Sequence, residues 1–298
     1  MPENSKVIAL GFFDGVHVGH AELLKAVRSV SEEKGLSPAV MSFDVHPDNL
    51  VFQKEVGLIF DSRERVRIIQ SLFQIDDTIL LRFTEDLMKM EWNEFLDLLI
   101  DKFNAKWLVV GYDFTFGHHG TGTVEKLKEY CTANEIGCTV VPPVYVNNEV
   151  VSSTKIRELI SEGNVEKANQ LLGHPYYISG TVVQGLHNGK KLGFPTLNIK
   201  MPVGNVVPHR GVYASKVALN DGRVFCSATD VGVKPTVCDD DTLLIESHLL
   251  DFSEMLYGRE ISIYLLSFIR PEQQFSSFAE LSNAIRNDVQ QVRKFFNI

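Results

Sequence analysis

Hydrophobic residues change their spacing once along the chain, near Gly173. Before that point, short apolar runs alternate with segments of helical period. The apolar runs cover residues 7–10, 39–43, 78–81, 107–110 and 139–141. Short buried strands that alternate with helices are typical of a parallel sheet with crossover helices. We therefore predict a Rossmann-like α/β domain over residues 1–172.

Local chemistry supports the helical segments of this first half. We predict helices over residues 62–73, 124–136 and 154–160. Asp61 and Glu64 have the spacing of a capping box, which fixes the start of the first of these helices. Gly137 stands where a left-handed residue commonly ends a helix. Ser152 and Ser153 precede the third helix, as N-capping residues do.

The second half of the chain has the alternating pattern of antiparallel strands. We predict strands over residues 176–184, 211–219, 223–231, 243–250 and 259–268. This pattern indicates an antiparallel β-barrel or sandwich over residues 173–298, with a linker at 172–176. The chain then ends in a predicted helix over 278–296. One apolar stripe of this helix should pack on the barrel, and it consists of Phe278, Leu281, Ile285, Val289, Val292 and Phe296.

Composition narrows the classes of function. The 298-residue chain carries a formal net charge of -9 and no run of Lys and Arg, which disfavours nucleic acid as a partner. A barrel that binds nucleic acid remains an alternative, and it predicts a basic face with interleaved aromatic residues. No apolar run is long enough to span a bilayer, so we expect a cytoplasmic protein with no membrane partner. The spacing of the four cysteines indicates reduced thiols.

The segment GFFDGVHVGH places His17, Gly19 and His20 where the first strand turns into a helix. The N-terminus of a helix offers unpaired N–H groups and the positive end of its dipole, which favour a phosphate. A glycine lets the backbone approach a ligand closely. For this short string taken alone, ordinary surface or core histidines are an equal alternative, and a zinc site is less favoured because no further ligands accompany the pair.

Three further segments extend this pattern: SFDVHP, VVGYDFTFG and VSSTKIRELISEG. Together with GFFDGVHVGH, and in the same order, they resemble segments of the prokaryotic bifunctional riboflavin kinase/FAD synthetases. The resemblance implies that the first domain is a nucleotidyltransferase that transfers the adenylyl group of ATP to FMN, giving FAD and pyrophosphate. It implies catalytic roles for His17, His20 and Arg157. Ser152 and Ser153 as plain helix caps, with Arg157 in solvent, are the alternative.

The resemblance also assigns ligand contacts in both halves of the chain. ATP or its phosphates are expected at Gly11, Phe12, Asp14, Gly15, Gly19, Ser152, Ser153, Thr154, Lys155, Gly185, Gly189 and Lys191. Flavin is expected at Phe43, His46, Asp113, Phe114, Phe116 and Arg259. For Phe114 and Phe116, packing in the core is the favoured alternative. Arg259 is equally suited to pairing with a nearby acid.

The segment GTVVQGLHNGKKLGFPTLNI resembles the riboflavin kinase signature of the same family. Thr196 and Asn198 offer side-chain oxygens, the ligands that Mg²⁺ prefers. The resemblance implies that Glu246 is the general base that accepts a proton from the ribityl hydroxyl of riboflavin. As an isolated residue in an alternating strand, Glu246 would instead face solvent.

Three residues of the second half depart from the family pattern: Leu186, Asn188 and Asp230. A carboxylate at position 230 would repel a phosphate unless a cation lies nearby. We therefore keep two hypotheses. The chain either makes FMN from riboflavin and FAD from FMN, or it makes only FAD and its barrel is a weak or inactive kinase. Both use ATP, Mg²⁺ and flavins as small-molecule ligands, and weak self-association is left open.

Overall fold

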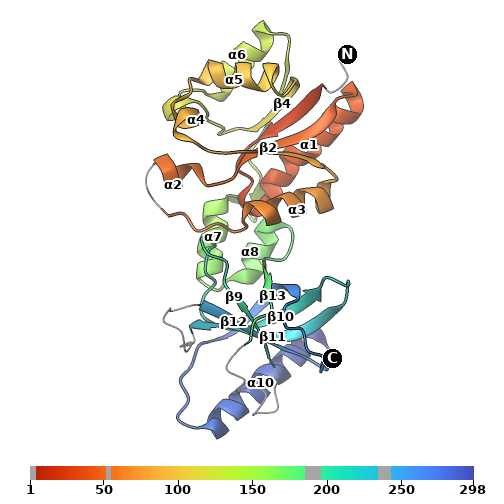
Figure 1. Ribbon diagram of the computed structural model, residues 1–298, viewed down its shortest axis with the longest axis vertical. Coiled ribbons are helices and arrows are strands. Elements are labelled where there is room, and N and C mark those ends of the chain that lie inside the picture. The colour runs from red at the N-terminus through yellow and green to blue at the C-terminus, as the bar shows by residue number, and fades with distance from the viewer. Residues whose placement is uncertain (1–4, 52–54, 185–195, 234–242) are drawn as a thin grey trace. The chain divides into compact units, whose positions relative to one another are not determined.

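The structure is a computed structural model that describes residues 5–51, 55–184, 196–233 and 243–298 (Figure 1). The chain divides into two compact units between Ser153 and Thr154. The residues of α7 (Ser153–Ser161) beyond its first, and all of α8 (Val165–Leu172), therefore group with the second unit. A domain boundary at residues 172 and 173 stays a prediction.

The first unit contains a sheet that is parallel throughout, in the order β3-β2-β1-β4-β5. Its strands are β1 (Lys6–Leu10), β2 (Ser37–Phe43), β3 (Asp77–Leu81), β4 (Ala105–Gly111) and β5 (Gly137–Val141). Each of them contains one of the five predicted apolar runs. The predicted Rossmann-like architecture is thus confirmed, because strands buried on both faces read as continuous apolar runs.

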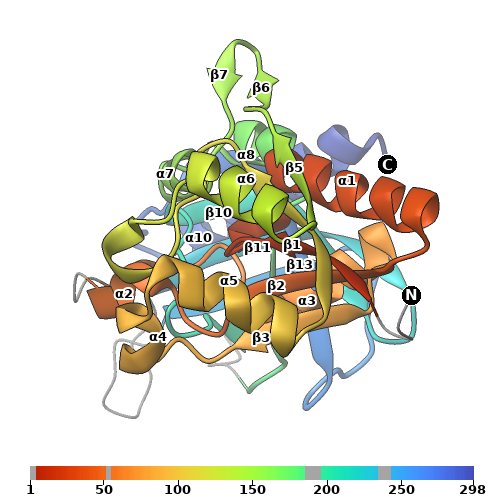
Figure 2. The same ribbon diagram turned by 90° about the horizontal axis from the view of Figure 1, so that it is seen from above.

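Helices cover both faces of this sheet. The helices of this unit are α1 (Val18–Lys34), α2 (Pro47–Val51), α3 (Ser62–Phe73), α4 (Glu85–Lys89), α5 (Trp92–Asp101) and α6 (Val124–Ala133), with 3₁₀ turns η1 (Asp14–Val16) and η2 (His118–Gly120). Ile8 and Leu10 point to the face that packs against α5 and α6 in one buried cluster. On the opposite face α1 contacts the sheet and α3 (Figure 2). A short hairpin, β6 (Tyr145–Val146) and β7 (Glu149–Val150), projects from this unit.

The local signals at the helix ends are partly confirmed. Helix α3 begins after Asp61, whose carboxylate accepts a hydrogen bond from the backbone N–H of Glu64 at 2.9 Å. The prediction that Gly137 ends helix α6 is wrong, because Gly137 is the first residue of β5. The residue with left-handed backbone in this turn is Glu135. Gly137 is required for another reason. A Cβ atom there would lie 2.0 Å from the ring of Trp107, so the glycine makes room for the indole.

The second unit contains an antiparallel sheet in the order β8-β13-β10-β11-β12-β9. Its strands are β8 (Tyr177–Thr181), β9 (Leu197–Lys200), β10 (Gly211–Leu219), β11 (Val224–Val233), β12 (Leu243–Leu249) and β13 (Glu260–Pro271). The two edges meet where Val183 bridges Asn198, with the N–H of Val183 donating to the Asn198 carbonyl at 2.8 Å. Of the predicted alternatives, barrel and sandwich, the structure is the barrel.

A chain of hydroxyl groups lies inside the barrel. Thr229 on β11 contacts Ser215 on β10 at 2.7 Å and Ser247 on β12 at 2.6 Å, oxygen to oxygen, and Ser215 also contacts Ser227. All four residues are completely buried. Since a buried hydroxyl without a partner is destabilising, these residues can occupy the interior only because they satisfy one another.

The last helix, α10 (Phe278–Phe296), packs on the outside of the barrel. Val292 is completely buried against Ala214 and Leu250, and Val289 and Phe296 extend this contact. The predicted stripe is therefore right for the second half of the helix. It is wrong for Phe278, which is 67% exposed because it lies in the first turn, away from this contact.

Candidate active sites

The order of the parallel sheet locates the first candidate site. The chain moves from β1 through β2 to β3 on one side, and then returns to β4 on the other side of β1. In open α/β sheets, ligands bind at the carboxyl ends of the strands that flank such a reversal. GFFDGVHVGH follows β1 and GYDFTFG follows β4, so the sheet brings two of the quoted segments to the same edge.

Asp14 holds the turn after β1 in place through hydrogen bonds. Its buried carboxylate accepts hydrogen bonds from the N–H groups of Ile59 at 2.9 Å and Phe60 at 3.2 Å. Its carbonyl accepts the hydroxyl proton of Ser153 at 2.9 Å. These contacts make Asp14 an anchor of the turn, while its expected contact with ATP stays a prediction. Gly11 and Gly15 lie in the same turn, Gly15 with a positive φ of 81°.

Two histidines mark the start of α1. His17 is the N-cap, and its Nδ1 accepts the N–H of His20 at 3.2 Å. The two imidazole rings stack with centroids 3.6 Å apart. A Cβ atom at Gly19 would lie 3.0 Å from Cε1 of His17, so the glycine leaves room for the ring to lie against the helix. The spacing of the motif thus produces one compact pair of rings at a helix N-terminus.

The surroundings of His20 determine its charge. Burial lowers the pKa of His20 well below its usual range, and the neighbouring His17 and Arg65 lower it further. His20 is therefore neutral at neutral pH and can donate a hydrogen bond without carrying a charge. Its buried Nδ1 has no hydrogen-bond partner within the residues that the structure describes. The feature of this turn that favours an anion is therefore the N-terminus of α1.

The segment SFDVHP lies beside this turn. The ring of His46 makes an edge contact with the ring of Phe12, with centroids 4.7 Å apart. The hydroxyl of Ser42 donates to the carbonyl of Phe12 at 2.8 Å. Phe43 ends β2 and packs edge-on against Phe83 at 5.0 Å. The structure therefore brings the predicted flavin residues Phe43 and His46 to the predicted ATP turn.

The segment GYDFTFG divides into exposed and buried positions. Asp113 is exposed just beyond the carboxyl end of β4. Phe116 is buried in the core of the first unit, and Phe114 packs against it with ring centroids 5.4 Å apart. Core packing, the favoured alternative for these two rings, is what the structure shows. Asp113 is thus one of three exposed residues of this segment, together with Tyr112 and Thr115.

The fourth segment forms the start of α7. Ser152 directly precedes this helix, and Ser153 is its first residue. Nη2 of Arg157 donates to the hydroxyl of Thr154 at 3.1 Å. Lys155 lies 3.3 Å from the carboxylate of Glu158 on the same helix. The cationic side chains of this segment thus lie in the first turns of α7, as the sequence predicts.

The second candidate site lies on the outer face of the barrel. Asn198, Glu246 and Asp230 stand directly opposite one another on β9, β12 and β11. Opposite residues of antiparallel strands project from the same face of a sheet. The hydroxyl of Thr196 donates to the carboxylate of Glu246. The predicted metal ligands Thr196 and Asn198 therefore lie beside the predicted base Glu246, although Thr196 and Glu246 are 50 positions apart in the chain.

The same row continues to a cation. Asp230 is opposite Val212 on β10, which is opposite Arg270 on β13. The carboxylate of Asp288 on α10 binds Arg270 at 2.8 and 2.7 Å and raises the pKa of the guanidinium, and Asp230 adds to this effect. The sequence predicted that a carboxylate at position 230 would repel phosphate unless a cation lay nearby. Arg270 is such a cation.

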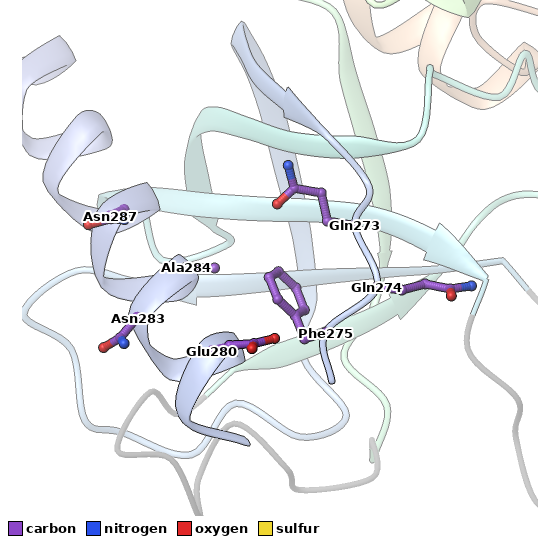
Figure 3. Close-up of a pocket in the computed structure, with 7 residues that line it drawn as sticks. All are labelled: Gln273, Gln274, Phe275, Glu280, Asn283, Ala284 and Asn287. Atoms are coloured by element: carbon purple, nitrogen blue, oxygen red, sulfur yellow. The ribbon is translucent and has the colours of Figure 1, made fainter. Parts of the chain in front are cut away.

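A shallow cavity of about 550 Å³ lies between the end of β13 and α10 (Figure 3). It is lined by Gln273, Gln274, Phe275, Glu280, Asn283, Ala284 and Asn287. Most of these side chains are amides, which both donate and accept hydrogen bonds. Arg270 lies beneath one wall, with its Cζ 5.7 Å from the centre of the Phe275 ring. The row of opposite residues that runs from Asn198 to Arg270 therefore ends beside this cavity.

Arg259 pairs with a nearby acid, which was the alternative to a flavin contact in the sequence analysis. The side chain is 57% exposed, and its Nη1 lies 3.8 Å from the carboxylate of Asp221. Its backbone carbonyl accepts the N–H of Val182 at 2.9 Å, next to the bridge that closes the barrel. A flavin contact of Arg259 stays a prediction. Gly185, Gly189 and Lys191, with Leu186 and Asn188, lie outside the described residues.

Sequence reasoning missed two polar groups: the buried Arg65 on α3, and the pair of Arg270 with the buried Asp288. Arg65 left a signal in the sequence. Arg65 stands three and four positions before Ile68 and Ile69, on the buried stripe of α3. A charge on an apolar stripe is expected only where it has buried partners. The cavity beside α10 had no such signal, because strand β13 and the helix meet there only in the folded barrel.

Comparison with known proteins assigns a family to each half of the chain. Residues 1–155 match the family described as FAD synthetase, and residues 172–296 match the family described as riboflavin kinase. Bifunctional riboflavin kinase/FMN adenylyltransferases from Listeria monocytogenes and Bacillus subtilis are each 35% identical to this chain. The alignments cover 98% of this chain and 93% and 92% of theirs.

A solved structure gives the same result for the fold. The crystal structure of a protein from Streptococcus pneumoniae that is named a macrolide-efflux protein superposes with a TM-score of 0.87. It is 30% identical, and the match covers 98% of this chain and 95% of that one. In the part of the chain described here, no helix combines the length and the apolarity needed to cross a bilayer. By its sequence matches, this chain belongs to the family of bifunctional riboflavin kinase/FMN adenylyltransferases.

Proposed function

We propose that this chain catalyses two successive reactions: riboflavin and ATP give FMN and ADP, and FMN and ATP give FAD and pyrophosphate. The supporting observation is that Thr196 and Asn198, at the start of β9, meet Glu246 on β12 in the second unit. This convergence favours an active kinase over a barrel that only stabilises the chain. A nucleic-acid-binding barrel is not supported, because acids occupy the row that a basic face would need.

In the adenylyl transfer, a phosphate oxygen of FMN attacks the α-phosphorus of ATP as the bond to pyrophosphate breaks. The enzyme's part is to position the groups and to stabilise the charge that develops. The N-terminus of α1 and neutral His20 offer N–H groups to the phosphates. We assign Ser152, Thr154, Lys155 and Arg157 to the triphosphate because their segment resembles the ATP-binding segment of the family.

In the kinase reaction, the terminal ribityl hydroxyl attacks the γ-phosphorus, and Glu246 accepts its proton. The hydroxyl of Thr196 holds the carboxylate of Glu246 in place. Thr196 and Asn198 carry neutral oxygen donors of the type that suits Mg²⁺, so the residues fit this ion. When bound, the ion offsets phosphate charge. Arg270 offsets the carboxylate of Asp230, which makes that residue compatible with a nearby nucleotide.

We assign the ring system of riboflavin to the cavity beside α10. Its volume of about 550 Å³ suits a small organic ligand. Gln273 and Asn283 carry amides that both donate and accept hydrogen bonds, as the pyrimidine edge of a flavin does, and Phe275 offers an aromatic face. We further propose a cytoplasmic location and ATP, FMN and riboflavin as the ligands.

Product analysis with each substrate offered separately tests this function. Purified protein is incubated with MgATP and either riboflavin or FMN, and the flavins are separated by chromatography. We expect FMN and FAD from riboflavin, and FAD from FMN. If the incubation with FMN gives FAD but riboflavin stays unchanged in the other incubation, the barrel is a non-catalytic module. The absence of FAD from both incubations would contradict adenylyl transfer.

A further inference from the structure

Arg65 is the largest of the completely buried side chains in the part of the chain that the structure describes, with 1% of its surface exposed. It lies in the first turn of α3, on the stripe that Ile68 and Ile69 bury. Arginine is almost never buried without partners, because removing its charge from water is costly. Its place in the core therefore needs an explanation from its contacts.

Those contacts join two segments of the first candidate site. Nη1 of Arg65 donates to the carbonyl of Phe12 and, at 2.7 Å, to the hydroxyl of Ser42. Nη2 donates to the carbonyl of Phe43 at 2.8 Å. Ser42 in turn donates to the carbonyl of Phe12. One guanidinium thus clamps the turn that follows β1 to the carboxyl end of β2.

The clamp also reaches the rings of the site. Cζ of Arg65 lies 4.2 Å from the centre of the Phe12 ring, whose edge meets the ring of His46. Phe13, the next residue in the turn, lies with its ring centroid 5.1 Å from that of His20. A shift of the Phe12 carbonyl would therefore move side chains on both sides of the phosphate-binding turn.

A lysine could not replace this contact set. The acceptors of Arg65 are two carbonyls and a hydroxyl that lie in different directions, and the planar guanidinium meets them with a fixed fork of N–H groups. Burial lowers the pKa of Arg65 to about 10, against opposing effects of Asp14, Asp61 and Asp44. The side chain therefore still carries its charge at neutral pH.

We propose that Arg65 is a positioning residue for adenylyl transfer. It holds the Phe12 and Phe43 carbonyls so that the phosphate-binding turn and the SFDVHP segment keep the single relative geometry that the reaction needs. This inference rests on the proposed function. A purely structural role for Arg65 predicts something different, namely a less stable first unit that reacts at the normal rate whenever it is folded.

The test compares Arg65→Lys with Arg67→Lys. Arg67 lies on the same helix, is 57% exposed and pairs with Glu64 at 3.6 Å, so it is a matched control. Single-turnover formation of FAD from FMN and MgATP is measured, with the KM for each substrate. We expect Arg65→Lys to lower the rate by roughly 10²-fold, the effect of misplacing reacting groups by about 1 Å. We expect KM to change much less, and Arg67→Lys to behave as wild type.

Two internal controls separate positioning from folding. Both tryptophans, Trp92 and Trp107, lie in the first unit, so their fluorescence reports the unfolding of that unit, and all rates are taken below the measured midpoint. Phosphorylation of riboflavin by the same sample should be unchanged, because it uses the second unit. Wild type that forms no FAD would contradict the proposed function rather than this inference.

Ser42→Ala provides a milder version of the same change in case Arg65→Lys does not fold. It removes the hydroxyl between Nη1 and the Phe12 carbonyl, and we expect a rate loss of roughly fivefold, which corresponds to about 1 kcal/mol, the worth of such a bond. Folded variants with a normal single-turnover rate would overturn the proposal. A rise in KM with an unchanged rate would also overturn it, because that result belongs to a residue that only binds substrate.

Discussion

The imidazole rings of His17 and His20 stack face to face, with centroids 3.6 Å apart and planes 11° from parallel. Two protonated imidazoles at this distance would repel each other. Burial and this neighbour both hold the pKa of His20 well below its ordinary value of 6.5. His20 is therefore neutral at neutral pH, although it lies at the N-terminus of a helix, where an anion is favoured.

A pH dependence of stability follows from the lowered pKa of His20. Above pH 6.5 both folded and unfolded chains carry a neutral His20, and this residue adds no pH dependence. As the pH falls below 6.5, the unfolded chain binds a proton that the folded chain does not, so the first unit loses stability. Denaturant titrations followed by tryptophan fluorescence should show a shallower loss for His20→Gln than for wild type. Equal slopes would contradict the lowered pKa.

The two candidate sites should fail independently. His20→Ala and Arg157→Ala should lower FAD formation from FMN, and neither should change phosphorylation of riboflavin. The physical reason is that both side chains are assigned to phosphates in the adenylyl transfer only. Product analysis by chromatography reports both activities in one sample. Unchanged FAD output from the folded double variant would remove the basis for the first site.

Glu246→Gln should lower riboflavin phosphorylation by roughly 10²–10⁴-fold, the usual contribution of a general base. Thr196→Val should also lower it, because the valine keeps the shape of the side chain but removes the hydroxyl that holds Glu246. FAD formation from supplied FMN serves as the control and should stay at the wild-type rate. Full kinase activity in Glu246→Gln would show that the base has been misassigned.

The ion pair of Arg270 with Asp288 should matter for the stability of the second unit. Asp288→Asn leaves the guanidinium of Arg270, which is 19% exposed, without its charged partner, so we expect a loss of about 1–3 kcal/mol in the free energy of unfolding. The control is Asp251→Asn, which removes the exposed partner of Arg293 on the same helix and should leave the midpoint unchanged. Thermal unfolding by circular dichroism, with the first unit followed separately by fluorescence, measures both. Equal midpoints for the two variants would contradict this prediction.

The hydroxyl chain inside the barrel gives a further stability prediction. Thr229→Val keeps the volume of the side chain but leaves Ser215 and Ser247 each without one partner, so we expect a loss of about 1–3 kcal/mol in the free energy of unfolding. Thr181→Val, on an exposed position of β8, is the control and should have little effect. A wild-type midpoint for Thr229→Val would show that the hydroxyls contribute no net stability.

Most of the secondary structure could be predicted because it depends on local periodicity. The five apolar runs became the parallel strands, and the spacing of Asp61 and Glu64 fixed the start of α3. The errors have one cause in common. Gly137 resembled a helix cap, but its conformation was set by the indole of Trp107 on a neighbouring strand. Phe278 fitted an apolar stripe, but only the second half of α10 touches the barrel.

The amino-acid sequence by itself determined the fold class, the family and the residue types of both sites, because periodicity and short motifs are written in neighbouring positions. Tertiary structure decided which of these residues meet. The register of β9, β12 and β11 alone aligns Asn198, Glu246 and Asp230, and the burial of α3 alone carries Arg65 to the Phe12 and Phe43 carbonyls. Such contacts join residues far apart in the chain, so no local pattern encodes them; they exist only once the strands have paired and the helices have packed.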